Sequence, residues 1–299
     1  MPDPDPSSLC AFSRAELRRL NQAERIWRQP PEARGEVGYL ARAFVVVNLP
    51  HSDPGVATPV WSRTNGDAAI TIQQGFVSIH GKLSGVGYPF GATARWLLVY
   101  VMTEAVRQQS PKVSLGPSIT AFLRALGLPS EGRRLRAVSD QLRRLLCASI
   151  RFTFRSHEMF AGRNLSLASD FLLWRQDAGQ RALGFATLND ALFRDLISHP
   201  VPLDIGAIRA LRDAPLAIDL FVWLSFRLRS LRHPLSLSWL ALQSQFGSDY
   251  AETKEFARNV RKELRRVHAV WPSLRTKFYR GGVTFFPPSE LPVKMRRRR

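Results

Sequence analysis

The sharpest hydrophobic pattern in the chain is ETKEFARNVRKELRRVHAVW, residues 252–271. At about 100° per residue, a helix separates its apolar side chains from its basic ones. The apolar side consists of Phe256, Val260, Leu264 and Val267. The opposite side consists of Lys254, Arg258, Arg261 and Arg265, flanked by Lys262 and Arg266. The pattern predicts an amphipathic helix that buries the first set and exposes the second.

A turn ending at Gly247 precedes this helix, and the sequence TKFYRGGVTFF follows it. The pair Gly281-Gly282 suits a two-residue turn with positive φ, so we expect paired strands over 278–280 and 283–286. A short helix, a turn, a basic helix and a hairpin are the element order of a winged helix, which is a helix-turn-helix with a β-wing. The alternative is a solvated helix whose charges only keep the protein soluble.

An earlier part of the chain repeats this order of elements. It contains a long apolar helix at 88–109, a short strand at 113–115, a short helix ending at Gly127 and a basic helix at 131–146. The later copy begins with an apolar helix after Asp213, which we expect to cap it, and continues with a strand at 235–238. Other strands are expected at 41–49, 68–81, 150–154, 165–169, 171–175 and 182–187. The pseudo-repeat predicts an α+β protein with two tandem winged-helix domains.

These patterns divide the chain into four parts. We expect an N-terminal extension (1–40), a first winged-helix domain (41–198), a second winged-helix domain (199–293) and a basic tail (294–299). We expect residues 1–12, which are rich in Pro and Asp, to be disordered. One helix is expected after them, because Ser13 and Glu16 have capping-box spacing. Pro200 and Pro202 are expected to break secondary structure between the two domains.

Charge points to a polyanionic partner. The 299 residues include 43 Lys and Arg against 24 Asp and Glu, a formal net charge of +19. Nucleic acid is the leading candidate and an anionic membrane surface the competitor, although no apolar run reaches the roughly 18 residues that span a bilayer. The beginning of the chain does not have the pattern of a secretory signal, and Cys10 and Cys147 cannot form a disulfide framework or a metal quartet. We expect a cytoplasmic protein without a cofactor.

Four segments resemble plasmid-encoded replication initiators of the RepA type. They are GYPFGATARWLLVYVMTEAVRQQSPKVSLGPSITAFLRALGL (87–128), DLFVWLSFRLRSL, YAETKEFARNVRKELRRVHAVWPSL and VTFFPPSELPV, and the resemblance covers residues 85–293. It implies two tandem winged-helix domains and binding to direct repeats at a plasmid origin. It also implies that monomers bind the repeats, that dimers repress their own gene, and that host replication proteins such as an initiator and a helicase are partners.

Arginine suits double-stranded DNA because its planar fork reaches guanine bidentately and also binds phosphate. We expect Arg258 and Arg261 to contact bases and the wing residues Lys277 and Arg280 to contact the backbone or minor groove. Asp140 is either an acceptor for cytosine or an ion-pair partner of Arg136 or Arg144. The full candidate set is Arg133, Arg136, Arg143, Arg144, Lys254, Arg258, Arg261, Lys262, Arg265, Lys277 and Arg280.

Two other functions remain open. A winged-helix repressor would use the same surfaces on a promoter inverted repeat. Tyr250 and Tyr279 lie near basic residues, as in a nicking enzyme or a recombinase, but His268 is followed by Ala-Val-Trp instead of the H-x-x-R element. The sequence also has no P-loop motif and no His-x-His pair. We therefore expect no enzymatic activity.

Overall fold

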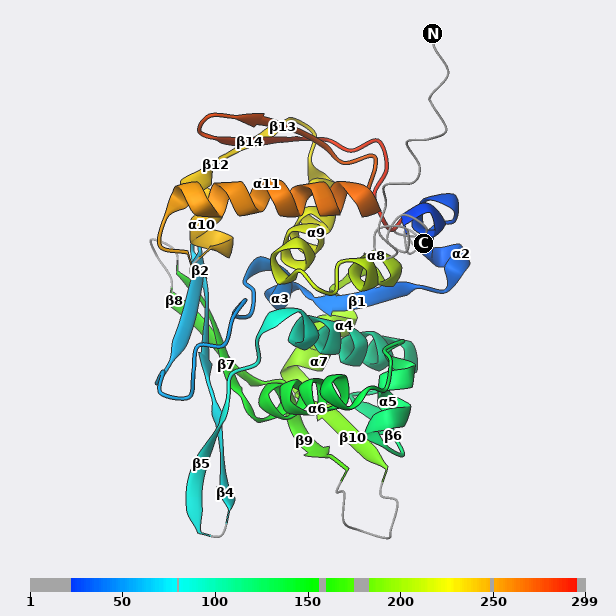
Figure 1. Ribbon diagram of the computed structural model, residues 1–299, viewed down its shortest axis with the longest axis vertical. Coiled ribbons are helices and arrows are strands. Elements are labelled where there is room, and N and C mark those ends of the chain that lie inside the picture. Colours follow the sequence, from blue (N-terminus) through cyan, green and yellow to red (C-terminus); the bar gives the residue numbers. More distant parts are fainter. Residues whose placement is uncertain (1–22, 80, 156–159, 175–182, 248–249, 295–299) are drawn as a thin grey trace.

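Two long apolar helices, α4 (Gly91–Gln108) and α9 (Pro215–Arg227), lie in the middle of the molecule (Figure 1). The computed structural model describes residues 23–79, 81–155, 160–174, 183–247 and 250–294. The two helices match the apolar helices predicted for the two copies of the pseudo-repeat. They contact each other, and most of their side chains are buried.

The other elements surround this pair. In chain order they are α2 (Pro31–Arg34), β1 (Val37–Ala41), α3 (Arg42–Val46), β2 (Trp61–Asn65), β3 (Ala68–Gln73), β4 (Gly75–Ile79), β5 (Lys82–Gly87), β6 (Lys112–Gly116), α5 (Ile119–Ala125), α6 (Gly132–Cys147), β7 (Ser149–Arg155), β8 (Phe160–Ser166), β9 (Ala168–Leu172), β10 (Gly184–Leu188), α7 (Asp190–Ser198), β11 (Pro200–Asp204), α8 (Ile205–Ala210), η2 (Leu228–Ser230), β12 (Leu235–Ser238), α10 (Trp239–Phe246), α11 (Thr253–Val270), β13 (Arg275–Tyr279) and β14 (Gly282–Phe286).

The described strands form five sheets in which every pair is antiparallel. Their strand orders are β1-β11, β4-β5, β6-β10-β9, β12-β14-β13 and β2-β3-β7-β8. The predicted α+β class is confirmed. Residues 23–28, at the end of the helix predicted from Ser13, are helical. The beginning of that helix, the end of the strand predicted over 171–175, the start of the strand predicted over 182–187 and most of the basic tail lie outside the described residues.

The amphipathic helix predicted near the carboxyl end is α11. Phe256, Val260, Leu264 and Val267 are all fully buried, as predicted. The short helix before it is α10, which packs against it, and the paired strands after it are β13 and β14.

The turn between these strands differs from the expectation of positive φ. Tyr279 pairs with Gly282, so the turn residues are Arg280 and Gly281, and neither glycine has positive φ. Gly282 is needed for a different reason, since a Cβ there would collide with the Leu237 carbonyl of β12. Close approach of two strands, and not the turn, requires this glycine.

The earlier copy is built from α5, α6 and the sheet β6-β10-β9. Helix α6 buries Val138, Leu142 and Leu145. Gly127 and Gly247 follow α5 and α10 at corresponding places, as predicted, but they act differently. Gly127 has the left-handed φ of +67°, whereas Gly247 has a φ of −118° and lies where a Cβ would meet the Phe256 ring at 2.6 Å.

The predictions for residues 41–49 and for Asp213 were also wrong. Residues 41–49 do not form one strand, because β1 ends at Ala41 and α3 follows at once. Burial overrides the β-propensity of this segment: Phe44 packs edge-on against Phe152, with 5.1 Å between the ring centroids. Asp213 does not cap α9, which starts with Pro215 after an Ala214 N-cap that makes no side-chain hydrogen bond.

The segment with Pro200 and Pro202 is not broken but forms β11, which pairs with β1. Proline is tolerated here because every strand of a two-stranded sheet is an edge strand. The pairing joins residues 37–41 to residues 200–204, and Arg34 extends it through an ion pair to Asp204 at 2.6 Å. The segment before α4 is thereby fixed to the segment before α9.

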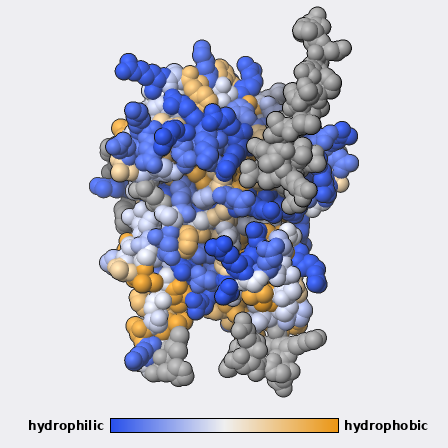
Figure 2. All heavy atoms as spheres, viewed as in Figure 1, coloured by the Kyte–Doolittle hydropathy of each residue, from blue (hydrophilic) through white to orange (hydrophobic). Residues whose placement is uncertain are grey.

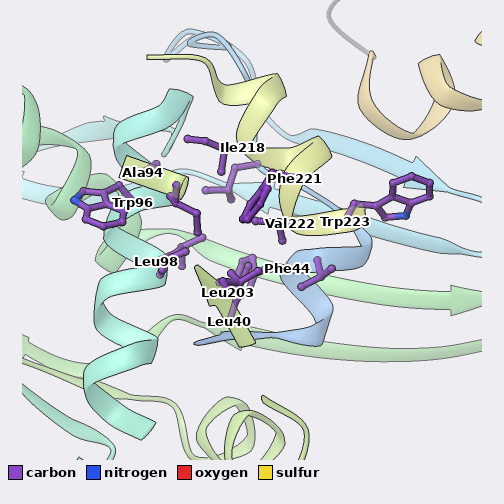
Figure 3. Close-up of a cluster of buried hydrophobic side chains, with 14 of the residues drawn as sticks. Leu40, Phe44, Ala94, Trp96, Leu98, Leu203, Ile218, Phe221, Val222 and Trp223 are labelled. Carbon is purple, nitrogen blue, oxygen red and sulfur yellow. The ribbon is translucent and has the colours of Figure 1, made fainter. Parts of the chain in front are cut away.

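A buried ion pair joins α4 to α9. Arg95 donates from Nε to Asp219 Oδ1 at 2.6 Å and from Nη2 to Oδ2 at 2.7 Å. It also donates to the carbonyls of Leu49, Pro50 and Gly91. Burial opposes the charge on Asp219, but Arg95 and the hydrogen bond to His51 outweigh it and hold the pKa of Asp219 below its ordinary value. The pair lies beside the cluster that Figure 3 shows, where Leu98 of α4 and Ile218 and Val222 of α9 line the same small cavity as Arg95 and Asp219.

Asp219→Ala should lower the free energy of unfolding by about 3–5 kcal/mol, because it leaves the Arg95 guanidinium buried without its counter-charge. Asp170→Ala is the control, since it removes an exposed carboxylate from β9 and should change stability by less than about 0.5 kcal/mol. Urea unfolding monitored by circular dichroism measures both. Equal effects of the two substitutions would contradict the role given to the pair.

Candidate nucleic-acid interface

The basic side of α11 faces solvent. Lys254, Arg258, Lys262 and Arg265 are exposed, and hydrophilic side chains gather over this helix in the upper part of Figure 2. The helix is held by its buried apolar side and by α10, whose N-cap Ser238 accepts a hydrogen bond from the Ala241 amide at 3.1 Å. Because the backbone of α11 is anchored, these cations are presented in a fixed row.

Arg261 occupies a different environment from its neighbours. Its guanidinium lies over the Trp239 ring at 4.6 Å and near the Phe278 ring at 5.8 Å. These two rings are stacked, and the Trp239 indole donates to the Arg280 carbonyl at 3.2 Å. Arg261 is therefore half-buried and ties α11 to α10 and β13 by cation–π contacts. The sequence pattern placed it among the basic residues but carried no sign of this aromatic support.

The hairpin adds further cations. Lys277 and Arg280 are exposed, as predicted for wing residues. Arg275, which sequence reasoning missed, is exposed on the same strand, and its guanidinium lies 5.4 Å from the Phe286 ring. Alternation along β13 places Arg275 and Lys277 on one face of the strand and Phe278 on the other. This alternation was the signal that could have identified Arg275.

The basic residues of α6 fall into two groups. Arg133 and Arg136 are exposed, and Arg143 is half-exposed beside Asp140 at 3.2 Å. Arg144 is held by Asp53 and Asp140, each at 2.7 Å, and by the Phe90 ring. The contacts of Arg144 with Asp53 and Phe90 fix the end of α6 to the segment before α4. Asp140 thus pairs with Arg144, one of the two partners predicted, and with Arg143.

The two tyrosines considered for nicking lie in unlike surroundings. Tyr250 packs against Phe256, with 5.4 Å between ring centroids, and its hydroxyl accepts a hydrogen bond from Asn259. Tyr279 is partly exposed on β13, and its hydroxyl donates to the Leu237 carbonyl at 3.3 Å. In the described part of the chain, no three His, Cys, Asp or Glu side chains are grouped so that they could hold a metal ion. No described helix is both long and apolar enough to cross a bilayer.

A model of the family described as plasmid-encoded RepA protein matches residues 88–239. The chain belongs to this family. The match extends from just before α4 to the first residue of α10, so it confirms the predicted resemblance over the first copy and the beginning of the second. The resemblance of α11 and its hairpin remains a prediction. No curated protein sequence matches the chain.

Solved structures similar to this RepA-family chain come from RctB. A crystal structure of selenomethionine derivatives of its domains 2 and 3 has a TM-score of 0.53 and 14% sequence identity, covering 81% of this chain and 95% of that chain. A second crystal structure of RctB domains 2–3 has a TM-score of 0.48 and 15% identity, covering 79% and 92%. At such identities, the first likeness shows a shared fold.

Arg261→Ala should destabilise the protein by about 0.5–1 kcal/mol, because it removes the cation–π contacts with Trp239 and Phe278. Arg258→Ala removes the same charge from an exposed position of the same helix and should change stability by less than about 0.5 kcal/mol. Urea unfolding of the two variants gives the comparison. If Arg258→Ala is the more destabilising, the support described for Arg261 is wrong.

Proposed function

We propose that this chain is a plasmid replication initiator that binds repeated double-stranded sites at an origin through two winged-helix domains. The membership in the RepA family supports the role in replication. The observation that carries the DNA-binding part is the row of exposed cations on α11, a helix whose opposite side is buried and whose neighbour is a two-stranded hairpin. This is the arrangement in which a recognition helix enters the major groove and a wing contacts the backbone.

The first copy supports a second DNA-binding domain. Helix α6 follows a short helix, buries an apolar side and exposes Arg133 and Arg136, as α11 exposes Arg258. The similar RctB structure is described as two domains, and this chain covers 95% of it. We therefore keep two domains and the second as residues 199–293, but start the first at β1 and not at residue 41, because a boundary at 41 would cut this strand. The β1–β11 pairing and the α4–α9 contact then join the two domains.

The contacts in the structure change the proposed role of one candidate side chain, Arg144, and leave the others as predicted. Arg258 and Arg261 are the residues we assign to bases, Arg261 with its guanidinium restrained by Trp239. Lys254 and Arg265, nearer the ends of the basic side of α11, are assigned to phosphates, and Lys277 and Arg280 to the backbone or minor groove. Bases or phosphates are assigned to Lys262, Arg133, Arg136 and Arg143. Arg144 is assigned to positioning α6, because its guanidinium is already held by two carboxylates.

The remaining parts of the proposal concern the setting. We propose that the protein acts in the cytoplasm without a cofactor or catalytic step, that dimers regulate its own gene, and that host replication proteins join it at the origin. The direct test is a replication assay. A plasmid that carries the DNA flanking the coding region should be maintained only when the protein is supplied, and maintenance without it would contradict the initiator assignment.

The double variant Arg258→Ala/Arg261→Ala should lose its preference for the flanking DNA over mixed-sequence DNA. Each base-contacting arginine is worth about 1–3 kcal/mol of discrimination. Electrophoretic mobility shifts with both DNAs measure the ratio of affinities, and circular dichroism checks that the variant is folded. Arg194→Ala is the matched control, since Arg194 is exposed on α7 and outside the proposed interface. A folded double variant that keeps the full preference would show that α11 does not read bases.

A further inference from the structure

A pocket of about 450 Å³ lies between α4, α6 and the segment that connects α8 to α9. Arg133 and Arg134 line it from the first turn of α6, and Arg212 lines it from the segment before α9. The pocket is therefore built by both copies of the pseudo-repeat. Figure 1 shows α4 and α6 as neighbours, and the contacts between α4 and α9 bring the third side close.

The three arginines are available to a ligand. Among the described residues, none of the three forms an ion pair or a side-chain hydrogen bond, whereas Arg143 and Arg144 of the same helix α6 are both paired with Asp140. Glu131 and Asp213 also line the pocket and are exposed, as Arg133 and Arg212 are, whereas Arg134 is partly buried. Three guanidinium groups therefore face two carboxylates around one cavity, and the excess of one positive charge favours an anion.

Trp96 supplies a second and independent sign of a ligand. Its side chain lines the pocket and is 6% exposed, and its indole nitrogen has no hydrogen-bond partner in the described part of the chain. Figure 3 shows this nitrogen at the outer end of the ring, turned away from Ala94 and Leu98. Buried donors are normally satisfied, so a donor without a protein partner beside a cationic pocket calls for an acceptor.

We propose that this pocket binds a phosphate group, with Arg134 and Arg212 as its principal ligands. Arginine forks match phosphate oxygens bidentately, and the pocket volume lies in the range of small-ligand sites. A phosphate of the bound duplex and a free phosphate compound share this chemistry. The first source rests on the proposed function and would make Arg134 and Arg212 further DNA contacts, with one phosphate held by both copies of the pseudo-repeat. The second source does not depend on DNA binding.

The experiment compares the wild-type chain with Arg134→Ala, Arg212→Ala and the control Arg194→Ala. In the DNA arm, binding to a mixed-sequence duplex of about three helical turns is measured over a range of salt concentrations. Each pocket variant should reduce the slope of log affinity against log salt by about one, because one phosphate contact is lost. In the DNA-free arm, pyrophosphate should raise the melting temperature of the wild type and of Arg194→Ala but not of the pocket variants.

The two arms separate the sources. Both effects together, the expected result, support a phosphate site that also takes a phosphate of the bound duplex. A reduced slope without a pyrophosphate effect identifies a DNA phosphate alone, and a pyrophosphate effect with unchanged slopes identifies a free phosphate compound. If the pocket variants match Arg194→Ala in both arms, the phosphate site is disproved. If the wild type itself does not bind duplex DNA, the proposed function fails, whereas the pyrophosphate arm still decides whether the pocket is a phosphate site.

Discussion

The ion pair between Arg95 and Asp219 is the constraint on which the arrangement of the molecule depends. It joins the two apolar helices that begin the two copies of the pseudo-repeat, and both partners are buried. Apolar contacts alone would allow α4 and α9 to slide, because dispersion and burial have little direction. The Arg95 guanidinium binds Asp219 through two hydrogen bonds and also donates to three backbone carbonyls, so the pair has one geometry. Removing either partner leaves the other charge buried without compensation. We infer that the pair selects one orientation of the two copies more than it adds net stability.

The consequence for function is geometric. Helices α6 and α11 belong to one chain, and each is anchored by its buried side to the part of the structure that the pair holds together. The strand pairing of β1 with β11 restrains the same junction from another side. Because the relative position of the two exposed basic helices is fixed, one chain can place them in two grooves of the duplex. A repressor acting on an inverted repeat would need a second copy of the chain for this.

Periodicity predicted the features that depend on neighbouring residues. The buried side of α11, the two apolar helices, the hairpin and the order of elements in both copies follow from local spacing. Contacts between distant residues were not predictable in this way: Arg144 is held by Asp53, Arg261 is supported by Trp239 and Phe278, and the prolines of β11 pair with residues 37–41. Residues 42–46 form a helix because Phe44 and Val45 are buried, and β-branched side chains alone do not carry that information.

The most direct test of two DNA-contacting helices in one chain is a hydroxyl-radical footprint of the monomer on its repeat DNA. Two helices in successive major grooves lie about 34–36 Å apart along one face of the duplex. The account predicts two protected patches with this spacing, one erased by replacing Arg133 and Arg136 with alanine and the other by replacing Arg258 and Arg261. A single symmetric site that only dimers protect would contradict it.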